Sequence, residues 1–139
     1  MGDYHVREDK GVGTFRVKFG ISNISDPSKR SEIAGLVDTG AAYPFIPEAI
    51  LRSIGIEPNG QRTFLLADGS SKVLPVGKAE FAFNGVTAPC LVVFGPAGSE
   101  PLFGALALES LGLEVDPVNQ RLKPATLYLA CYQFPPNIH

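Results

Sequence analysis

The sequence predicts a single domain that is mainly β, with two short helices. Apolar and polar residues alternate along much of the chain, which is typical of strands with one buried face. The 15 Gly and 12 Pro residues indicate many turns. The length of 139 residues suits one hydrophobic core and leaves little room for a second. We therefore expect one domain over residues 1–139 of the all-β (mainly) class.

The expected strands follow one another along the chain and are separated by turn-forming residues. The first is an alternating run at 15–21, and the second is a short apolar run at 33–37. Further strands are expected at 62–67, 72–83, 88–94, 113–116 and 121–123. Asp-Gly and Asn-Gly pairs favour hairpins because both residue types tolerate positive φ. Turns are accordingly predicted at Asp68-Gly69-Ser70, at Asn84-Gly85 and around 117–120.

Two short helices are expected between these strands. The first is predicted at 47–54, with Pro47 at its start and Gly55 at its end. The second is predicted at 105–111 and ends at Gly112. Its residues Ala105, Leu108 and Leu111 share one face, which should pack on the sheet.

Charge and targeting signals exclude several classes of partner. The net charge of −2 gives no general attraction to nucleic acid or anionic lipid. No apolar run approaches membrane-spanning length, and the charged first ten residues do not resemble a signal peptide. Cys90 and Cys131 are too few and too far apart for a disulfide framework. We expect a cytoplasmic protein that binds neither nucleic acid nor membrane.

The remaining chemistry points to one carboxylate. The two histidines, His5 and His139, lie at the chain ends, which disfavours a nucleophile activated by histidine. No compact spacing of His, Cys or carboxylates suggests a metal site, so no metal and no cofactor are expected. In contrast, the strand at 33–37 leads directly into Asp38 on a Thr39-Gly40 turn. Asp38 is therefore the candidate catalytic group.

The surroundings of Asp38 resemble those in the retropepsin-like family of aspartic proteases, in its bacterial and cellular branch. The resemblance covers about residues 13–124 and preserves the order of the family's segments. Leu36-Val37-Asp38-Thr39-Gly40-Ala41 looks like the catalytic loop, and Ala67-Asp68-Gly69-Ser70 lies where the flap hairpin should turn. Leu102-Phe103-Gly104 and the following helix look like the segment that supports the catalytic loop.

This resemblance implies an acid-protease half-barrel that acts as a homodimer. Asp38 would meet Asp38 of a second subunit, and the two carboxylates would share a proton and activate water against a peptide bond. Thr39 would hydrogen-bond across the dimer, and Gly40 would let substrate approach closely. The flap would close over an extended peptide or protein substrate. The tail at 125–139 is a possible interface strand.

Some features depart from the family or leave alternatives open. An acid and an arginine found in some retroviral members are replaced by Ala42 and Ala105, so apolar packing is expected to hold the loop. Apolar pockets are expected to involve four residues, Ile46, Leu74, Val76 and Phe103. Asp38 could instead be a turn aspartate that accepts hydrogen bonds from nearby backbone amides. The whole chain could then be a non-catalytic dimeric module that binds peptides.

Overall fold

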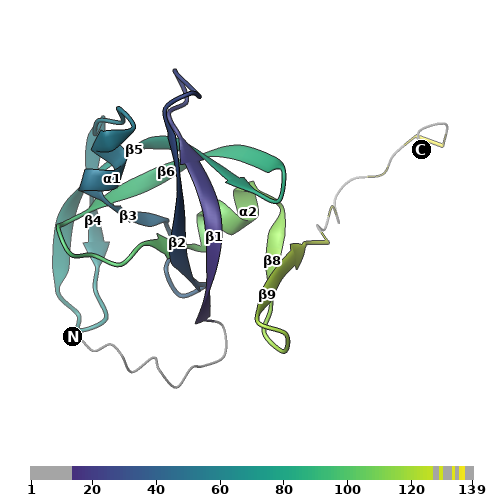
Figure 1. Ribbon diagram of the computed structural model, residues 1–139. Coiled ribbons are helices and arrows are strands. Elements are labelled where there is room, and N and C mark those ends of the chain that lie inside the picture. Colours follow the sequence, from purple (N-terminus) through teal and green to yellow (C-terminus); the bar gives the residue numbers. More distant parts are fainter. Residues whose placement is uncertain (1–13, 127–128, 130–132, 134, 137–139) are drawn as a thin grey trace.

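The computed structural model describes residues 14–126, 129, 133, 135 and 136. Within these residues the chain is mainly β, as predicted, and its two helices are short (Figure 1). The elements in chain order are β1 (Thr14–Ser22), β2 (Arg30–Asp38), β3 (Phe45–Pro47), α1 (Glu48–Ser53), β4 (Gly60–Leu65), β5 (Ser71–Phe83), β6 (Val86–Gly95), β7 (Leu102–Phe103), α2 (Ala105–Ser110), β8 (Leu113–Asp116) and β9 (Arg121–Pro124).

Seven strands form one sheet in the order β1-β2-β7-β3-β6-β5-β4. β1 also pairs with β5 through Gly20 and Ala82, so the sheet closes on itself and leaves β4 outside the closed barrel. The pairings of β2 with β7 and of β3 with β6 are parallel, whereas the hairpins are antiparallel. Closure removes the free edge that β1 would otherwise present.

The hairpin turns follow the residue types that the sequence supplies. Asn84 and Gly85 both adopt positive φ, at 55° and 85°, and connect β5 to β6 as expected for an Asn-Gly pair. The β4–β5 connection is longer: only Gly69 has positive φ, at 88°, and the Leu66 amide donates to the Ser70 carbonyl at 2.8 Å. β4 therefore ends at Leu65, before the predicted limit at residue 67.

Three phenylalanine rings form the centre of the core. Phe19 stacks on Phe103 at 4.3 Å between ring centroids, and Phe81 lies 5.9 Å from Phe19 and 6.1 Å from Phe103. All three side chains are fully buried. They come from β1, β5 and β7, so this cluster links distant parts of the chain to the short strand that precedes Gly104.

The two helices occur where the sequence predicted them, within one residue at each end. α2 packs on the barrel through Ala107 and Leu108, and Leu111 is buried just beyond its last turn. The predicted apolar face is correct for Leu108 and Leu111, but Ala107 is fully buried and Ala105 only half-buried.

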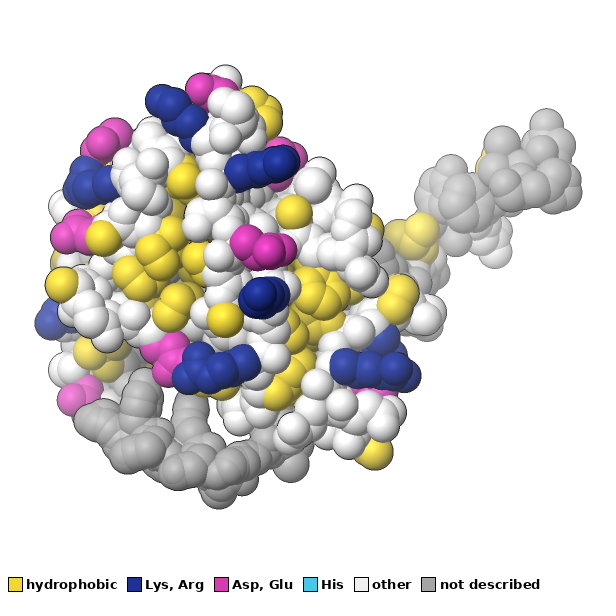
Figure 2. All heavy atoms as spheres, in the orientation of Figure 1, with side chains coloured by type: hydrophobic (Ala, Val, Ile, Leu, Met, Phe, Trp, Pro, Cys, Tyr) yellow, Lys and Arg dark blue, Asp and Glu magenta, His cyan; other side chains and the backbone are white. Residues whose placement is uncertain are grey.

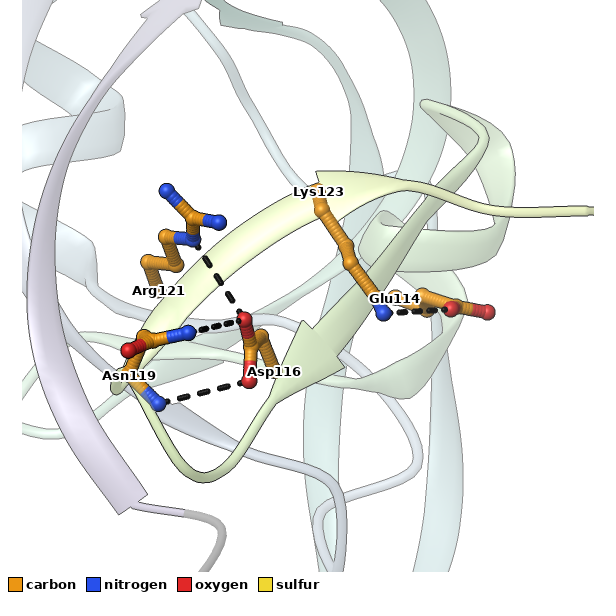
Figure 3. Close-up of polar contacts among 5 residues, drawn as sticks. All are labelled: Glu114, Asp116, Asn119, Arg121 and Lys123. Carbon is orange, nitrogen blue, oxygen red and sulfur yellow. Dashed lines mark hydrogen bonds and ion pairs between the residues drawn. The ribbon is translucent and has the colours of Figure 1, made fainter.

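β8 and β9 form a separate two-stranded hairpin beside α2 (Figure 1). The Asp116 carboxylate accepts hydrogen bonds from the backbone amide and side-chain amide of Asn119, at 3.3 and 2.9 Å, and faces Arg121 (Figure 3). Glu114 and Lys123 pair across the strands at 3.5 Å (Figure 3). Most of the predicted tail strand lies outside the described residues.

Candidate active site

Asp38 is the last residue of β2, and its backbone pairs with Thr14 of β1. The Gly40 amide donates to Asp38 Oδ1 at 2.9 Å, and the Ala41 amide donates to the Asp38 carbonyl at 3.1 Å. These two bonds define a tight turn that orients the half-buried carboxylate at the end of the strand. Thr39 and Gly40 are exposed on this turn.

Leu102 and Phe103 lie directly beside the strand that leads to Asp38. β7 pairs in parallel with β2, with Leu36 opposite Leu102 and Val37 opposite Phe103. The Leu36 amide also donates to the Pro101 carbonyl at 2.9 Å. The end of β2 is thus held on one side by β1 and on the other by β7.

Gly104 allows the backbone after Asp38 to approach the start of α2. A Cβ atom at Gly104 would lie 2.5 Å from the carbonyl oxygen of Tyr43 and 2.7 Å from that of Ala41. Carbon and oxygen atoms cannot approach this closely, so the arrangement requires glycine. The structure thereby brings the predicted supporting segment 102–104 against the predicted catalytic loop.

The first amides of α2 bind this loop directly. The Ala105 amide donates to the Ala41 carbonyl at 2.8 Å, and the Leu106 amide donates to the Ala42 carbonyl at 2.9 Å. These are amides that a helix cannot satisfy within itself, and the loop supplies their acceptors. Main-chain hydrogen bonds therefore hold the loop at Ala41 and Ala42, where the sequence led us to expect apolar packing.

The predicted flap residues Ala67, Asp68, Gly69 and Ser70 form the exposed turn between β4 and β5. Asp68 Oδ1 accepts hydrogen bonds from the Ser70 hydroxyl at 2.6 Å and the Ser70 amide at 2.9 Å. These bonds, the hydroxyl first, lower the pKa of Asp68. The ionised carboxylate therefore stabilises the shape of this turn.

Tyr43 connects the β4–β5 hairpin to the Asp38 loop, and the sequence analysis did not identify it. Its ring lies edge-on to Phe64 at 5.7 Å and 82°, and its hydroxyl accepts a 3.5 Å hydrogen bond from Arg62. A sequence signal existed, because an aromatic residue before Pro44 directly follows the candidate loop. The partner residues, however, lie some twenty positions further along the chain.

The predicted apolar pocket is wrong for three of its four residues. Ile46, Val76 and Phe103 are 0%, 4% and 0% exposed, so they belong to the core and cannot line a cleft in this structure. Leu74 is half-buried. A surface groove of about 650 Å³ lies instead at the other end of β1 from Asp38, and it contains none of the predicted site residues. Its charged lining residues are Lys18, Arg30, Glu32 and Glu80.

The thiol of Cys90 is unsuited to act as a nucleophile. Cys90 of β6 is buried, and this burial raises the pKa of its thiol to about 11, an effect that Ser110 partly offsets. The thiol is therefore protonated at neutral pH, and nucleophilic attack requires the thiolate. Among the described residues, no group of three or more His, Cys, Asp or Glu side chains is placed to hold a metal ion.

Positive and negative side chains are mixed on the face shown in Figure 2. Lys and Arg side chains are separated from one another there, and hydrophobic side chains occupy much of the centre (Figure 2). No helix in the described part of the chain is both long and apolar enough to cross a membrane.

Comparison with known proteins gives little further guidance. No protein-family model matches the sequence. A curated protein of Listeria innocua serovar 6a, described as 1-deoxy-D-xylulose-5-phosphate synthase, is 34% identical over 102 residues. The match covers 73% of this chain but 15% of that protein. A similarity to so short a part of a larger protein assigns neither a family nor an activity to the chain.

Proposed function

We propose that the chain is a retropepsin-like aspartic endopeptidase that acts as a homodimer. The observation that supports this proposal most strongly is the Asp38 loop and its attachment to α2. A carboxylate at the end of a strand is oriented by the Gly40 amide, and the loop after it is bound by the Ala105 and Leu106 amides. Such preorganisation is what acid–base catalysis needs, because a catalytic group must keep its orientation during the reaction.

The proposal requires two chains, since Asp38 supplies one carboxylate. Thr39 and Gly40 are exposed in the single chain, as expected of residues that would meet a second copy. In the dimer, two Asp38 carboxylates would lie too close for both to ionise and would share one proton. They would face an extended peptide held beneath the β4–β5 hairpin.

The reaction would proceed without a covalent intermediate. The ionised Asp38 takes a proton from a water molecule, whose oxygen attacks the peptide carbonyl carbon. The protonated Asp38 of the second chain donates its proton to the carbonyl oxygen. The tetrahedral species then collapses and its carbon–nitrogen bond breaks. The Asp38 that took the water's proton gives it to the leaving nitrogen, and the other Asp38 takes a proton back from a hydroxyl of the tetrahedral species, so the pair again shares one proton.

We expect the enzyme to act in the cytoplasm. Cys90 is free and buried, and free thiols are usual in a reducing compartment such as the cytoplasm.

A peptide library offered to the purified protein at mildly acidic and at neutral pH tests this activity. The proposal predicts cleavage that falls at least about 100-fold in the Asp38→Asn variant, because removal of an acid–base group typically costs that much. Asp26→Asn is the matched control, since the Asp26 carboxylate also accepts a hydrogen bond from the backbone amide of the residue two positions on, Ser28. Cleavage that persists in Asp38→Asn would refute the assignment, as would sensitivity to chelators, which a metal-dependent hydrolase should show.

The second candidate is a non-catalytic dimeric peptide-binding module. It is favoured by the bond between the Gly40 amide and Asp38 Oδ1, because an aspartate that only stabilises a turn makes the same bond. The same library distinguishes the two. Peptides that bind but stay intact with both the wild type and Asp38→Asn would support the binding module.

A further inference from the structure

Tyr43 has a main chain that is held on both sides. On the preceding residue, the Ala42 carbonyl accepts a hydrogen bond from the Leu106 amide at 2.9 Å. On the following residue, the Pro44 carbonyl accepts one from the Val93 amide, also at 2.9 Å. Pro44 is fully buried. A residue that precedes proline is also restricted to extended conformations. The backbone of Tyr43 therefore has little freedom relative to the barrel and to the loop that carries Asp38.

The Tyr43 side chain contacts one face of β4. Phe64 and Arg62 are two positions apart, so their side chains lie on the same face of the strand. Phe64 meets the Tyr43 ring edge-on, a favoured geometry for two aromatic rings, and Arg62 donates to its hydroxyl. One half-buried side chain thus joins the fixed loop to two residues of the hairpin.

β4 is the last strand in the sheet order and pairs with β5 on one side only, so contacts from outside the sheet are needed to fix its position. It pairs with β5 from Gly60 to Leu65, and β5 continues into the barrel beyond Val76. The distal half of the β4–β5 hairpin carries exposed apolar side chains, with Leu65 78% and Val73 54% exposed. These side chains add no packing that would hold the hairpin against the barrel. Contacts on the opposite face, where Phe64 lies, must set its position.

We propose that Tyr43 is a positioning residue that holds the β4–β5 hairpin in place relative to the Asp38 loop. This inference rests on the proposed function in one respect, namely that the hairpin covers substrate. Loss of an edge-on ring pair should increase the population of displaced hairpin about two- to tenfold. In the endopeptidase this displacement raises KM by a similar factor and leaves kcat nearly unchanged, because the carboxylates themselves are untouched.

The position of the hairpin can be measured without any catalytic assay. The chain contains no tryptophan, so Leu66→Trp places a single reporter at the hairpin turn. Leu66 is 40% exposed, and the hydrogen bond from its backbone amide to the Ser70 carbonyl does not depend on its side chain. Acrylamide quenching and fluorescence anisotropy then report the exposure and local motion of the turn in the full chain.

The proposal predicts that Tyr43→Leu increases quenching of this reporter and lowers its anisotropy, and that Tyr43→Phe restores both, because the ring pair is kept. Phe64→Leu should act like Tyr43→Leu from the other side of the contact. Phe83→Leu, a half-buried aromatic at the far end of β5, is the matched control and should change neither signal. Thermal melts identify any variant that fails to fold.

Unchanged fluorescence in both folded variants, Tyr43→Leu and Phe64→Leu, would overturn the proposal. The kinetic arm then tests its link to function. If the wild type cleaves peptides, Tyr43→Leu should raise KM and Tyr43→Phe should not; a fall in kcat alone would contradict a positioning role. If the wild type cleaves nothing, the proposed function fails, and the fluorescence result still decides whether Tyr43 positions the hairpin.

Discussion

Gly104 shows how one missing side chain shapes the candidate site. Its φ of −84° is accessible to any residue, so glycine is required here by the close approach of the Ala41 and Tyr43 carbonyls rather than by backbone conformation. The obstructing atoms belong to the backbone and cannot rotate away as a flexible side chain could, and the Ala41 carbonyl is also held by the Ala105 amide.

Gly104→Ala should therefore destabilise the protein by about 1–3 kcal/mol, the usual cost of forcing extra atoms into a packed region. Chemical denaturation measures the change in unfolding free energy. Gly60→Ala is the control, because its Cβ would meet only Val76 Cγ2, at 3.8 Å, an ordinary contact. Equal stability of the two variants would show that the loop and α2 separate easily.

Asp116 shows how a short turn becomes sensitive to pH. Hydrogen bonds lower the pKa of Asp116 below the ordinary aspartate value of 3.8: the bond from the side-chain amide of Asn119 has the largest effect, followed by those from its backbone amide and from Arg121. Because the folded pKa is the lower one, the stabilisation is present above about pH 3.8 and is lost as the pH falls through the folded pKa.

Asn119→Ala should raise the pKa of Asp116 toward its ordinary value, so the acid-induced loss of stability begins at a higher pH. Carboxyl chemical shifts in an NMR titration measure this pKa. Asp68 is an internal control, since its lowered pKa depends on Ser70 and not on Asn119. A titration of Asp116 that is the same in both proteins would contradict the hydrogen bonding in Figure 3.

At the scale of elements, α2 acts through its first turn. The helix spans only Ala105–Ser110, but its first two amides bind the carbonyls of Ala41 and Ala42. β7 brings the helix start to this place by pairing in parallel with β2. A very short strand and a very short helix together determine the path of the chain after Asp38.

Ala105→Pro tests this connection without breaking the helix, because proline suits the first helical position but has no amide hydrogen. The Ala41 carbonyl then loses its partner, which should cost about 0.5–1.5 kcal/mol of unfolding free energy. Amide exchange at Gly40 and Ala41 should also become faster. Ala105→Ser keeps the amide and is the control. Unchanged exchange in the proline variant would mean that other contacts hold the loop.

At the scale of the whole molecule, local patterns predicted most of the strands and both helices, but not the short strand β7 or the long-range contacts between elements. The hairpin at Asn84-Gly85 and both helices follow from residue types within a few positions. The closure of β1 onto β5 through Gly20 and Ala82 does not, because neither residue carries a local signal for its distant partner. The contact between Tyr43 and Phe64 was missed for the same reason.

The mistaken pocket has a related physical cause. Ile46, Val76 and Phe103 are apolar, and apolar residues line both cores and binding clefts. Only the three-dimensional arrangement shows that these three point into the barrel. The family resemblance predicted that Leu102-Phe103-Gly104 supports the loop, but the hydrogen bonds from the Ala105 and Leu106 amides to Ala41 and Ala42 required the structure.

The central claim is that Asp38 is half of an active site shared by two chains. Wild-type protein can be refolded together with increasing fractions of Asp38→Asn at constant total concentration, and the rate of peptide cleavage measured for each mixture. If each site needs two intact carboxylates, the rate falls as the square of the wild-type fraction, to about one quarter at equal amounts. A rate that falls in direct proportion to the wild-type fraction would show that each chain acts alone and would contradict the claim.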